Sequence, residues 1–447
     1  MGKLAKLGSM IDPQIQLLLE ETYDLKFRRT QQGEIYLKSC LYNVVQLLRN
    51  HARFRGCCVY DDFAEQIEFR LSPQGAREIL TEYHVDLLRF EFQDRYDVNF
   101  KKDDLFSAIE IVAKENRRNP LIDHIKSFSG LWTSEMPSLC EMLLIKYLGC
   151  EDTPLNRAYS LRWILSIVAR ARATIKSPVK CDTVLVLYGD QGIGKSTFLE
   201  TICFRSEFGR KYFLDNNIVM GTKDAVQAIQ GKIIVELQEL AKRSKDAETE
   251  KAFISLQIDD LRLPYKRTNE KFARRCVFAA TTNKPHVLSD ASGSRRFWCV
   301  TAGETLSRGE RLFDPQEGGL SRLQELERDL PMIWSEALHR LERNEPHWLT
   351  PEEEELRKKS AEYYTAPHPL TEPVMKIVSG KSVVTTADIL KELYEDPDPM
   401  KKCTKHLDKS TRRNQNIIGD ILSSHGWRYG RGRISGRRLR AWFAPVE

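Results

Sequence analysis

Several patterns that define common protein classes are missing from this 447-residue sequence. No apolar run approaches the about 20 residues that a membrane-spanning helix needs, and runs such as residues 184–187 are far shorter. The first ten residues, MGKLAKLGSM, contain no apolar stretch of the kind found in secretory signals. Their Gly-Ser-Met end is typical of a tag remnant, so residues 1–10 are set aside. We therefore expect no membrane partner.

Zinc-site and primase patterns are also missing. The ten cysteines include no C-x-x-C pair, and no two histidines have metal-ligand spacing, which argues against a zinc site. Scattered cysteines without a secretory signal favour a reducing, cytoplasmic location. A primase would need an acidic D-x-D on a strand, whereas the D-x-D at residues 396–398 lies among prolines.

Charge is unevenly distributed. The whole chain has a net charge of +6, but residues 401–447 contain twelve Lys or Arg and three Asp or Glu, a local charge of +9. The remainder is therefore −3. A basic end on a mildly acidic body favours a polyanionic partner, most simply nucleic acid. A solvated basic surface is the alternative, and composition does not separate the two.

Apolar patterns predict the domain organisation. Short β-branched runs at residues 183–187, 232–235 and 276–280 are separated by helical stretches, which predicts an α/β fold with a parallel sheet. Helices are expected at residues 42–50, 105–113, 156–174, 323–341 and 351–364. The expected domains are a mixed N-terminal domain (11–150), a parallel-sheet α/β core (151–310), a helical extension (311–365), a proline-containing linker (366–373) and a basic C-terminal domain (374–447).

A glycine-rich motif follows the first of these strands. The sequence GDQGIGKS matches G-x-x-x-x-G-K-[ST], the P-loop pattern, between a strand that ends at Tyr188 and a helix that starts at Lys195. Glycines allow the backbone N–H groups to surround phosphates, and the helix N-terminus favours the same charge. Lys195 should contact the β- and γ-phosphates of ATP, and Ser196 should hold Mg²⁺. The expected nucleotide-binding residues are Gly189, Asp190, Gln191, Gly192, Ile193, Gly194, Lys195, Ser196 and Thr197. A structural Gly-rich turn is the alternative.

Hydrolysis would need further groups near the phosphates. Glu236 ends an apolar run, and we expect it at the end of a neighbouring strand, where it could polarise water or share the Mg²⁺ shell, with Glu239 behind it. Asn283 follows the third strand and could orient the attacking water. Arg295 and Arg296 lie on a Gly/Ser turn and could reach a neighbouring subunit as arginine fingers. A strand-capping Glu, a turn Asn and a surface Arg pair are the alternatives.

Two basic regions could contact DNA. Residues 251–275 form a charged segment with turn signals near Lys266 and Arg267, which predicts a basic hairpin; a solvated charged loop is the alternative. The C-terminal domain shows helical patterns at residues 386–394, with Thr386 as the cap, and at 412–424, followed by an arginine-rich β-hairpin at 427–443. This order predicts a winged helix, and a basic oligomerisation module is the alternative. The expected DNA-binding residues are Lys266, Arg267, Arg412, Arg413, Arg431, Arg433, Arg437 and Arg438.

The motif order resembles one family. KSTFLETI, IVELQEL, KAFISLQIDDLRLPYKR, VFAATTN and LSDASGSRRFW are similar to segments of the virulence-associated E proteins of phages, prophages and genomic islands, over roughly residues 120–348. The usual Trp-Asp-Gly of the family's first segment is here Leu131-Trp132-Thr133. The resemblance implies an AAA+-like ATPase that forms a hexameric ring around single-stranded DNA. It also implies that Glu236 is the catalytic acid, Asn283 the sensor, and Arg295 or Arg296 the finger.

These observations lead to one functional expectation with two alternatives. The expected protein is an ATP- and Mg²⁺-dependent helicase of superfamily 3 type, which binds single-stranded and duplex DNA and acts in the replication of a phage, prophage or genomic island. The first alternative is an ATP-switched protein that binds and melts an origin without translocating. The second is a nucleotide-sensing defence ATPase with no DNA substrate.

Overall fold

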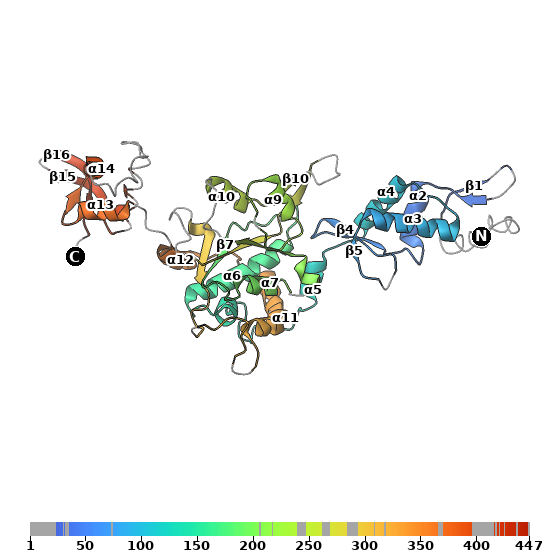
Figure 1. Ribbon diagram of the computed structural model, residues 1–447, viewed down its shortest axis with the longest axis horizontal. Coiled ribbons are helices and arrows are strands. Elements are labelled where there is room, and N and C mark those ends of the chain that lie inside the picture. Colours follow the sequence, from blue (N-terminus) through green and yellow to red (C-terminus); the bar gives the residue numbers. More distant parts are fainter. Residues whose placement is uncertain are drawn as a thin grey trace. The chain divides into compact units, whose positions relative to one another are not determined.

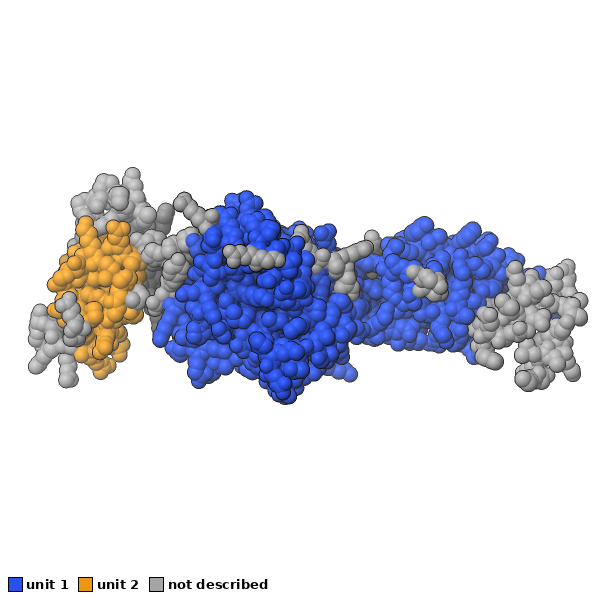
Figure 2. Space-filling view, turned by 90° about the horizontal axis from the view of Figure 1, so that it is seen from below, with its two compact units in different colours: residues 1–364 blue, residues 365–447 orange. Residues whose placement is uncertain are grey.

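The computed structural model forms two compact units, Met1–Tyr364 and Thr365–Glu447, coloured separately in Figure 2. Each unit is considered by itself. Within the described ranges, no helix has the length and hydropathy that crossing a membrane requires. The described residues are 24–29, 31, 35–72, 75–204, 207–216, 218–238, 247–261, 269–283, 294–307, 309–316, 319–364, 370–395, 415, 418–419, 421–423, 425–434 and 437–445.

The first 118 residues contain a small α/β core of their own. Apolar side chains of α2 (Leu41–Asn50), α3 (Glu82–Tyr96) and α4 (Lys102–Glu115) pack with those of the strands. The helical spacing at 42–50 and 105–113 correctly predicted α2 and α4. A four-stranded sheet has the order β5-β4-β3-β6, and a separate pair joins β1 to β2. The strands are β1 (Phe27–Arg29), β2 (Ile35–Leu37), β3 (Cys58–Asp61), β4 (Gln66–Phe69), β5 (Glu78–Ile79) and β6 (Arg117–Arg118).

A five-stranded parallel sheet lies between the two cores formed mainly by residues 120–364, and it confirms the expected α/β class. Its strand β7 is labelled in Figure 1. Its order is β13-β7-β12-β9-β8, so the strand before the glycine-rich motif lies between β13 and β12. Every neighbouring pair is parallel, so all carboxyl ends lie at one edge. The strands are β7 (Val184–Tyr188), β8 (Phe213–Leu214), β9 (Ile234–Gln238), β12 (Val277–Thr282) and β13 (Phe297–Thr301).

Helices cover both faces of this sheet. Alternate side chains of β7 enter two different cores: Leu185 and Leu187 pack on one side, Val184 and Val186 on the other. The larger core contains apolar residues of α5 (Pro120–Lys126), the π-helical segment Leu143–Tyr147, α6 (Pro154–Ala171), α7 (Lys195–Ile202) and α11 (Arg322–Glu342). The smaller core contains residues of α9 (Lys223–Ala228) and α10 (Ala247–Ser255), together with Tyr364 at the end of α12 (Pro351–Tyr364).

Two segments that the sequence patterns assigned to other domains pack into the core of the parallel sheet. Apolar residues between 120 and 150, which the sequence grouped with the N-terminal domain, belong to the larger core of the parallel sheet. The segment grouped as a helical extension also contributes to this core through Leu312 and several residues of α11. Periodicity located α11 to within one residue at each end, whereas α5 and the segment Leu143–Tyr147 were not predicted. An apolar pattern also cannot say which core a helix face joins.

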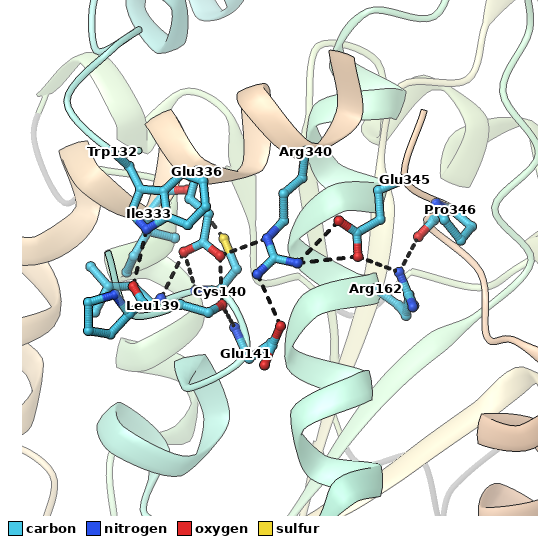
Figure 3. Close-up of polar contacts among 12 residues, drawn as sticks. Trp132, Leu139, Cys140, Glu141, Arg162, Ile333, Glu336, Arg340, Glu345 and Pro346 are labelled. Carbon is cyan, nitrogen blue, oxygen red and sulfur yellow. Dashed lines mark hydrogen bonds and ion pairs between the residues drawn. The ribbon is translucent and has the colours of Figure 1, made fainter. Parts of the chain in front are cut away.

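A charged network joins residues 138–141 to helices α6, α11 and α12 (Figure 3). The carboxylate of Glu336 on α11 is fully buried. It accepts hydrogen bonds from Ser138 Oγ (2.6 Å), Leu139 N (2.7 Å), Cys140 N (2.9 Å) and Arg340 Nε (2.8 Å). Arg340 also pairs with Glu141 and Glu345, and Arg162 of α6 joins Glu345 to Glu353 of α12.

The segment that replaces the usual Trp-Asp-Gly is anchored beside this network. Trp132 is buried; its backbone N–H donates to Ser335 Oγ and its indole N–H to the carbonyl of Pro137. The guanidinium of Arg340 lies 5.7 Å from its ring. Trp132 therefore holds this segment against α11.

The second unit has a separate core under a three-stranded antiparallel sheet of order β14-β16-β15. Described residues between 415 and 423 are helical, and Ile418, Ile421 and Leu422 are buried as expected. The predicted arginine-rich hairpin is present as β15 and β16. The other elements precede it: α13 (Thr371–Val378), β14 (Val383–Val384), α14 (Thr386–Glu395), β15 (Arg428–Ile434) and β16 (Arg437–Phe443).

Two local predictions in this unit were wrong. Helix α13 begins inside the range interpreted as a linker. Pro373 is tolerated in this helix because it lies in the first turn, where the backbone N–H makes no intrahelical hydrogen bond. The cap of α14 is Thr385, whose Oγ1 accepts from Asp388 N, while its own N–H donates to the Asp388 carboxylate. Thr386 instead accepts a hydrogen bond from the indole of Trp442.

Candidate functional site at the carboxyl edge of the parallel sheet

The glycine-rich motif forms the connection from β7 to α7, as the sequence predicts. Gly189 has a φ of 154°, and a Cβ there would lie 2.8 Å from the carbonyl oxygen of Ala302. Gly194 has a φ of 112°, and its Cβ would lie 3.2 Å from Leu312 Cβ. Both the backbone angles and the neighbouring chain therefore require glycine at these positions. The N–H of Gly189 donates to the carbonyl of Thr282, which joins the motif to β12.

Lys195 folds back against the start of this loop. Its Nζ donates to the carbonyl oxygens of Gly189 (2.8 Å) and Asp190 (2.7 Å). Burial lowers the pKa of Lys195, although the nearby charges of Asp190 and Glu236 act in the opposite direction. A cation held in this way is stabilised by an anion placed against the loop.

Glu236 contacts the loop directly. It is fully buried, and its Oε1 accepts hydrogen bonds from Ser196 Oγ (2.6 Å) and Thr281 Oγ1 (2.6 Å). Within the described part of the chain, its Oε2 has no hydrogen-bond partner although it is buried. Burial raises the pKa of Glu236, and the hydrogen bonds from the two hydroxyl groups only partly offset this. A buried carboxylate oxygen without a donor is costly unless a ligand satisfies it.

The position of Glu236 differs from the sequence expectation in two respects. It lies within β9 rather than at its end, and β12 separates β9 from β7. The distance is bridged because Ser196 and Thr281 both extend towards the same oxygen. Thr281 was missed as a site residue, and the only signal in the sequence was a hydroxyl near the end of an apolar strand.

Asn283 immediately follows β12 and is exposed at the same edge of the sheet. The neighbouring Thr282 is the residue whose carbonyl binds Gly189. The structure therefore brings Asn283, Glu236 and the loop to one edge, while Glu239 lies outside the described residues.

Arg295 and Arg296 lie elsewhere. They belong to the 3₁₀ turn Ser294–Arg296, which precedes β13 and therefore lies at the amino edge of the parallel sheet. Arg295 is exposed, whereas Arg296 is partly buried and its Nε donates to Ser255 Oγ (3.3 Å). The two arginines do not meet the glycine-rich loop of their own chain.

The predicted basic hairpin is present as β10 (Ile258–Leu261) and β11 (Glu270–Ala273), which are antiparallel. Lys266 and Arg267 lie outside the described residues. At the base of the hairpin, Arg274 is buried against Asp259, and Arg170 donates to the Arg274 carbonyl.

Among the C-terminal arginines, Arg431 is exposed on β15. Arg433, Arg437 and Arg438 belong to β15 and β16, but their side chains lie outside the described part of the structure, as do Arg412 and Arg413 entirely.

The donor set at the loop fits Mg²⁺. Among the described residues, no three His, Cys, Asp or Glu side chains group as a metal site. Mg²⁺ bound with phosphates needs only one or two carboxylates from the protein, with waters and phosphate oxygens completing its shell. The Ser196 hydroxyl and the unsatisfied Oε2 of Glu236 provide that kind of set.

The geometry is that of an α/β protein with a parallel sheet and a glycine-rich loop at its carboxyl edge. The chain belongs to the virulence-associated protein E-like family, because the family profile matches residues 130–366, more than half of the sequence. The resemblance drawn from the motifs is thereby confirmed.

Comparison with solved structures finds the apo NrS-1 C terminal region (305–718), with a TM-score of 0.43 and 13% identity, covering 87% of this chain and 95% of that chain. An A form apo structure of that region has a TM-score of 0.41 and 13% identity, with coverage of 87% and 96%. No curated protein matches the sequence.

Proposed function

We propose that this chain is an Mg²⁺-dependent ATPase with an AAA+-like core, and that it acts as a DNA helicase of superfamily 3 type in the replication of a phage, prophage or genomic island. The observation that carries this proposal is the cluster of Ser196, Glu236 and Thr281 beside the glycine-rich loop, with one buried oxygen of Glu236 unsatisfied. A structural turn would not require a buried, half-satisfied carboxylate.

Each residue of the cluster has a distinct role in this proposal. Backbone N–H groups of residues 189–197 surround the phosphates, and Lys195 turns its amine from the loop carbonyls to the β- and γ-phosphates. Ser196 and Glu236 would hold Mg²⁺, which would neutralise charge on the phosphate oxygens. Thr281 fixes the orientation of the Glu236 carboxylate. Asn283 orients the attacking water, and the Glu236 carboxylate polarises it, with Glu239 behind it.

The strand order supports the AAA+-like interpretation. In chain order, the strands of the parallel sheet are arranged 5-1-4-3-2, which places the acidic strand two positions from the loop strand with the Asn283 strand between them. Polar groups from three strands therefore converge at one edge, where ligands of open parallel sheets bind.

The location of the arginine pair supports action between subunits. Arg295 and Arg296 lie at the sheet edge opposite their own loop, so a finger could reach a γ-phosphate only in a neighbouring copy. A head-to-tail interface forms a ring where its rotation closes, and the family resemblance implies a closed hexamer. Because Arg296 is engaged with Ser255, the exposed Arg295 is the better candidate for the finger.

The DNA contacts are proposed for two regions. The turn between β10 and β11, with Lys266 and Arg267, would contact single-stranded DNA in the ring. The second unit runs helix, strand, helix, helix and two hairpin strands, with the first strand paired to the last. This arrangement supports a winged helix that binds duplex DNA through Arg412, Arg413, Arg431, Arg433, Arg437 and Arg438.

The proposal is tested by the rate of ATP hydrolysis with and without single-stranded DNA, together with unwinding of a forked duplex and the assembly state. Lys195→Ala should abolish hydrolysis and unwinding, while Lys176→Ala, a change at an exposed lysine, should leave both unchanged. Near wild-type turnover by Lys195→Ala would overturn the ATPase assignment. Hydrolysis stimulated by DNA without strand separation would favour an origin-melting switch, and hydrolysis indifferent to DNA would favour a nucleotide-sensing ATPase.

A further inference from the structure

A solvent-exposed aromatic ring lies beside the glycine-rich loop. Phe313 is 45% exposed, although large aromatic side chains are usually mostly buried. A Cβ built on Gly194 would lie 3.6 Å from Phe313 Cδ1, so the ring is in direct contact range of the loop. The proposed functions of the loop residues do not account for this ring.

The residue before the ring is fixed by two backbone hydrogen bonds. The N–H of Leu312 donates to the carbonyl of Ile193 in the loop (3.0 Å), and the carbonyl of Leu312 accepts from Leu323 N (3.2 Å) at the start of α11. Leu312 itself is fully buried. The exposed ring is therefore attached to a fixed point of the core rather than to a free loop.

Arg311 completes the surface. A local turn is formed because Arg311 N donates to the Asp314 carboxylate (2.8 Å) and Asp314 N to the Arg311 carbonyl (3.0 Å). The Arg311 guanidinium lies 5.5 Å from the centre of the Phe313 ring, and Arg311 is exposed. An aromatic ring and an arginine plane are the two kinds of side chain on which nucleic-acid bases stack.

The sheet order indicates which part of a nucleotide this surface faces. Glu236 and Thr281, on β9 and β12, define one side of the loop, where the γ-phosphate and Mg²⁺ would lie. The segment with Phe313 follows β13, which flanks β7 on the other side. A nucleoside triphosphate bound with its γ-phosphate towards β12 extends its base away from that side, towards β13.

We propose that Phe313, supported by Arg311, is the stacking surface for the base of the bound nucleotide. This inference rests on the proposed ATPase function and adds the residues that recognise the base. Only the base of a nucleotide can stack on an aromatic ring. Loss of the Phe313 ring should therefore weaken the binding of nucleotides but not of a bare polyphosphate. Purines offer a larger stacking area than pyrimidines, so Phe313 should also favour ATP over CTP.

The test is titration calorimetry on the full chain with Mg²⁺, using ATP, ADP and inorganic tripolyphosphate. Phe313→Ala should weaken ATP and ADP binding by on the order of tenfold, within the range measured for the loss of one base–aromatic stack. Binding of tripolyphosphate should stay within about twofold of the wild type, and Phe313→Tyr should restore nucleotide affinity. Trp348→Ala, which removes another exposed aromatic ring, should change none of the three affinities.

Two results would overturn the inference, and neither would count against the ATPase itself. Equal weakening of ATP and tripolyphosphate by Phe313→Ala would show that the ring supports the loop rather than the base. Unchanged ATP affinity would show that the base lies elsewhere. A wild-type chain that binds none of the three ligands would instead refute the proposed function. Steady-state hydrolysis offers a second readout, because loss of base stacking should raise KM and leave kcat unchanged.

Discussion

The substitution Glu336→Gln tests how the charged network holds the first unit together. All four groups that bind the buried carboxylate act as donors: two backbone N–H groups, the guanidinium of Arg340 and the hydroxyl of Ser138. A glutamine side chain has one acceptor oxygen and one NH₂ group. Whichever way the amide is turned, its NH₂ group faces at least one obligatory donor, either Arg340 Nε–H or the two backbone N–H groups (Figure 3).

The expected cost follows from these contacts. A buried donor without an acceptor costs about 1–3 kcal/mol, and the remaining hydrogen bonds lose their charge assistance. Breaking a buried ionic network by removing one partner typically costs about 3–5 kcal/mol in total. The unfolding entropy of a unit of 364 residues is large, so this cost corresponds to a fall in the unfolding midpoint of only about 4–6 °C.

Tryptophan fluorescence during heating measures this change, because Trp132 and Trp334 are buried near the network. The matched control is Glu327→Gln, at an exposed position of the same helix, for which we expect a shift well below that of Glu336→Gln. Scans are compared at one heating rate, since unfolding of a chain this large can be irreversible. A midpoint for Glu336→Gln equal to that of the control would refute the reasoning.

Four further outcomes are expected. Glu236→Gln should abolish ATP hydrolysis and raise the unfolding midpoint of the nucleotide-free protein, because a neutral amide avoids the cost of the buried charge; a lower midpoint would contradict this. Burial acts to raise the pKa of Asp329, but hydrogen bonds from Arg328, Lys146 and Tyr147 lower this pKa to about 2, from an ordinary value of 3.8. The ionised carboxylate therefore stabilises the fold above about pH 4. The stability advantage over Asp329→Asn should therefore shrink as the pH falls from about 4 to 2, and a constant difference would count against it. A mixture of Arg295→Ala and Lys195→Ala chains should regain some hydrolysis if the finger acts between subunits, and no regain in mixed rings shown to form would place the arginine in cis. Removal of residues 365–447 should leave hydrolysis intact, weaken duplex binding and reduce the slope of log affinity against log salt by about 0.9 for each phosphate that the protein no longer neutralises, whereas an unchanged salt slope would contradict DNA binding by this unit.

Local patterns in the sequence predicted the local parts of the fold. The glycine-rich loop needs its residues at fixed spacing between a strand and a helix, so it can be recognised from eight consecutive letters. The predicted bounds of α12 match those in the structure, because Thr350 caps the helix and accepts from Glu353 N. The polar end of β12 was also located from the sequence, through Asn283, but the hydroxyl there that binds Glu236 belongs to Thr281 and was not predicted.

The parts of the site that the sequence did not predict depend on contacts between residues far apart in the chain. Thr281 and Glu236 are 45 positions apart, and only the pairing of β12 with β9 brings them together. The same is true of Arg274 and Arg275, which the sequence placed in a basic segment. Arg274 is buried against Asp259, and Arg275 binds Glu65 and the carbonyl of Ala173, so both stabilise the base of the hairpin. Charge along a segment does not reveal which side chains are already paired.

Two buried glutamates of the first unit show how contacts separate structure from function. Glu336 and Glu236 are both fully buried, and each lies in an apolar stretch of sequence that gives no indication of its partners. Glu336 uses both oxygens, each with two donors, so its charge is compensated in the folded chain. Glu236 uses one oxygen, and the other receives no hydrogen bond from the described residues. Burial raises the pKa of Glu236, and the two hydroxyl groups only partly offset this.

The same chemical change should therefore have opposite effects on stability at the two positions. Glutamine at 336 removes a compensated charge and leaves donors unsatisfied, whereas glutamine at 236 removes a charge that the fold alone does not compensate. A buried charge that destabilises the ligand-free protein marks a position where a bound ligand supplies the missing compensation. That asymmetry, rather than the presence of an acid after an apolar run, is the physical reason to propose Glu236 as a Mg²⁺ ligand and to regard Glu336 as part of the framework.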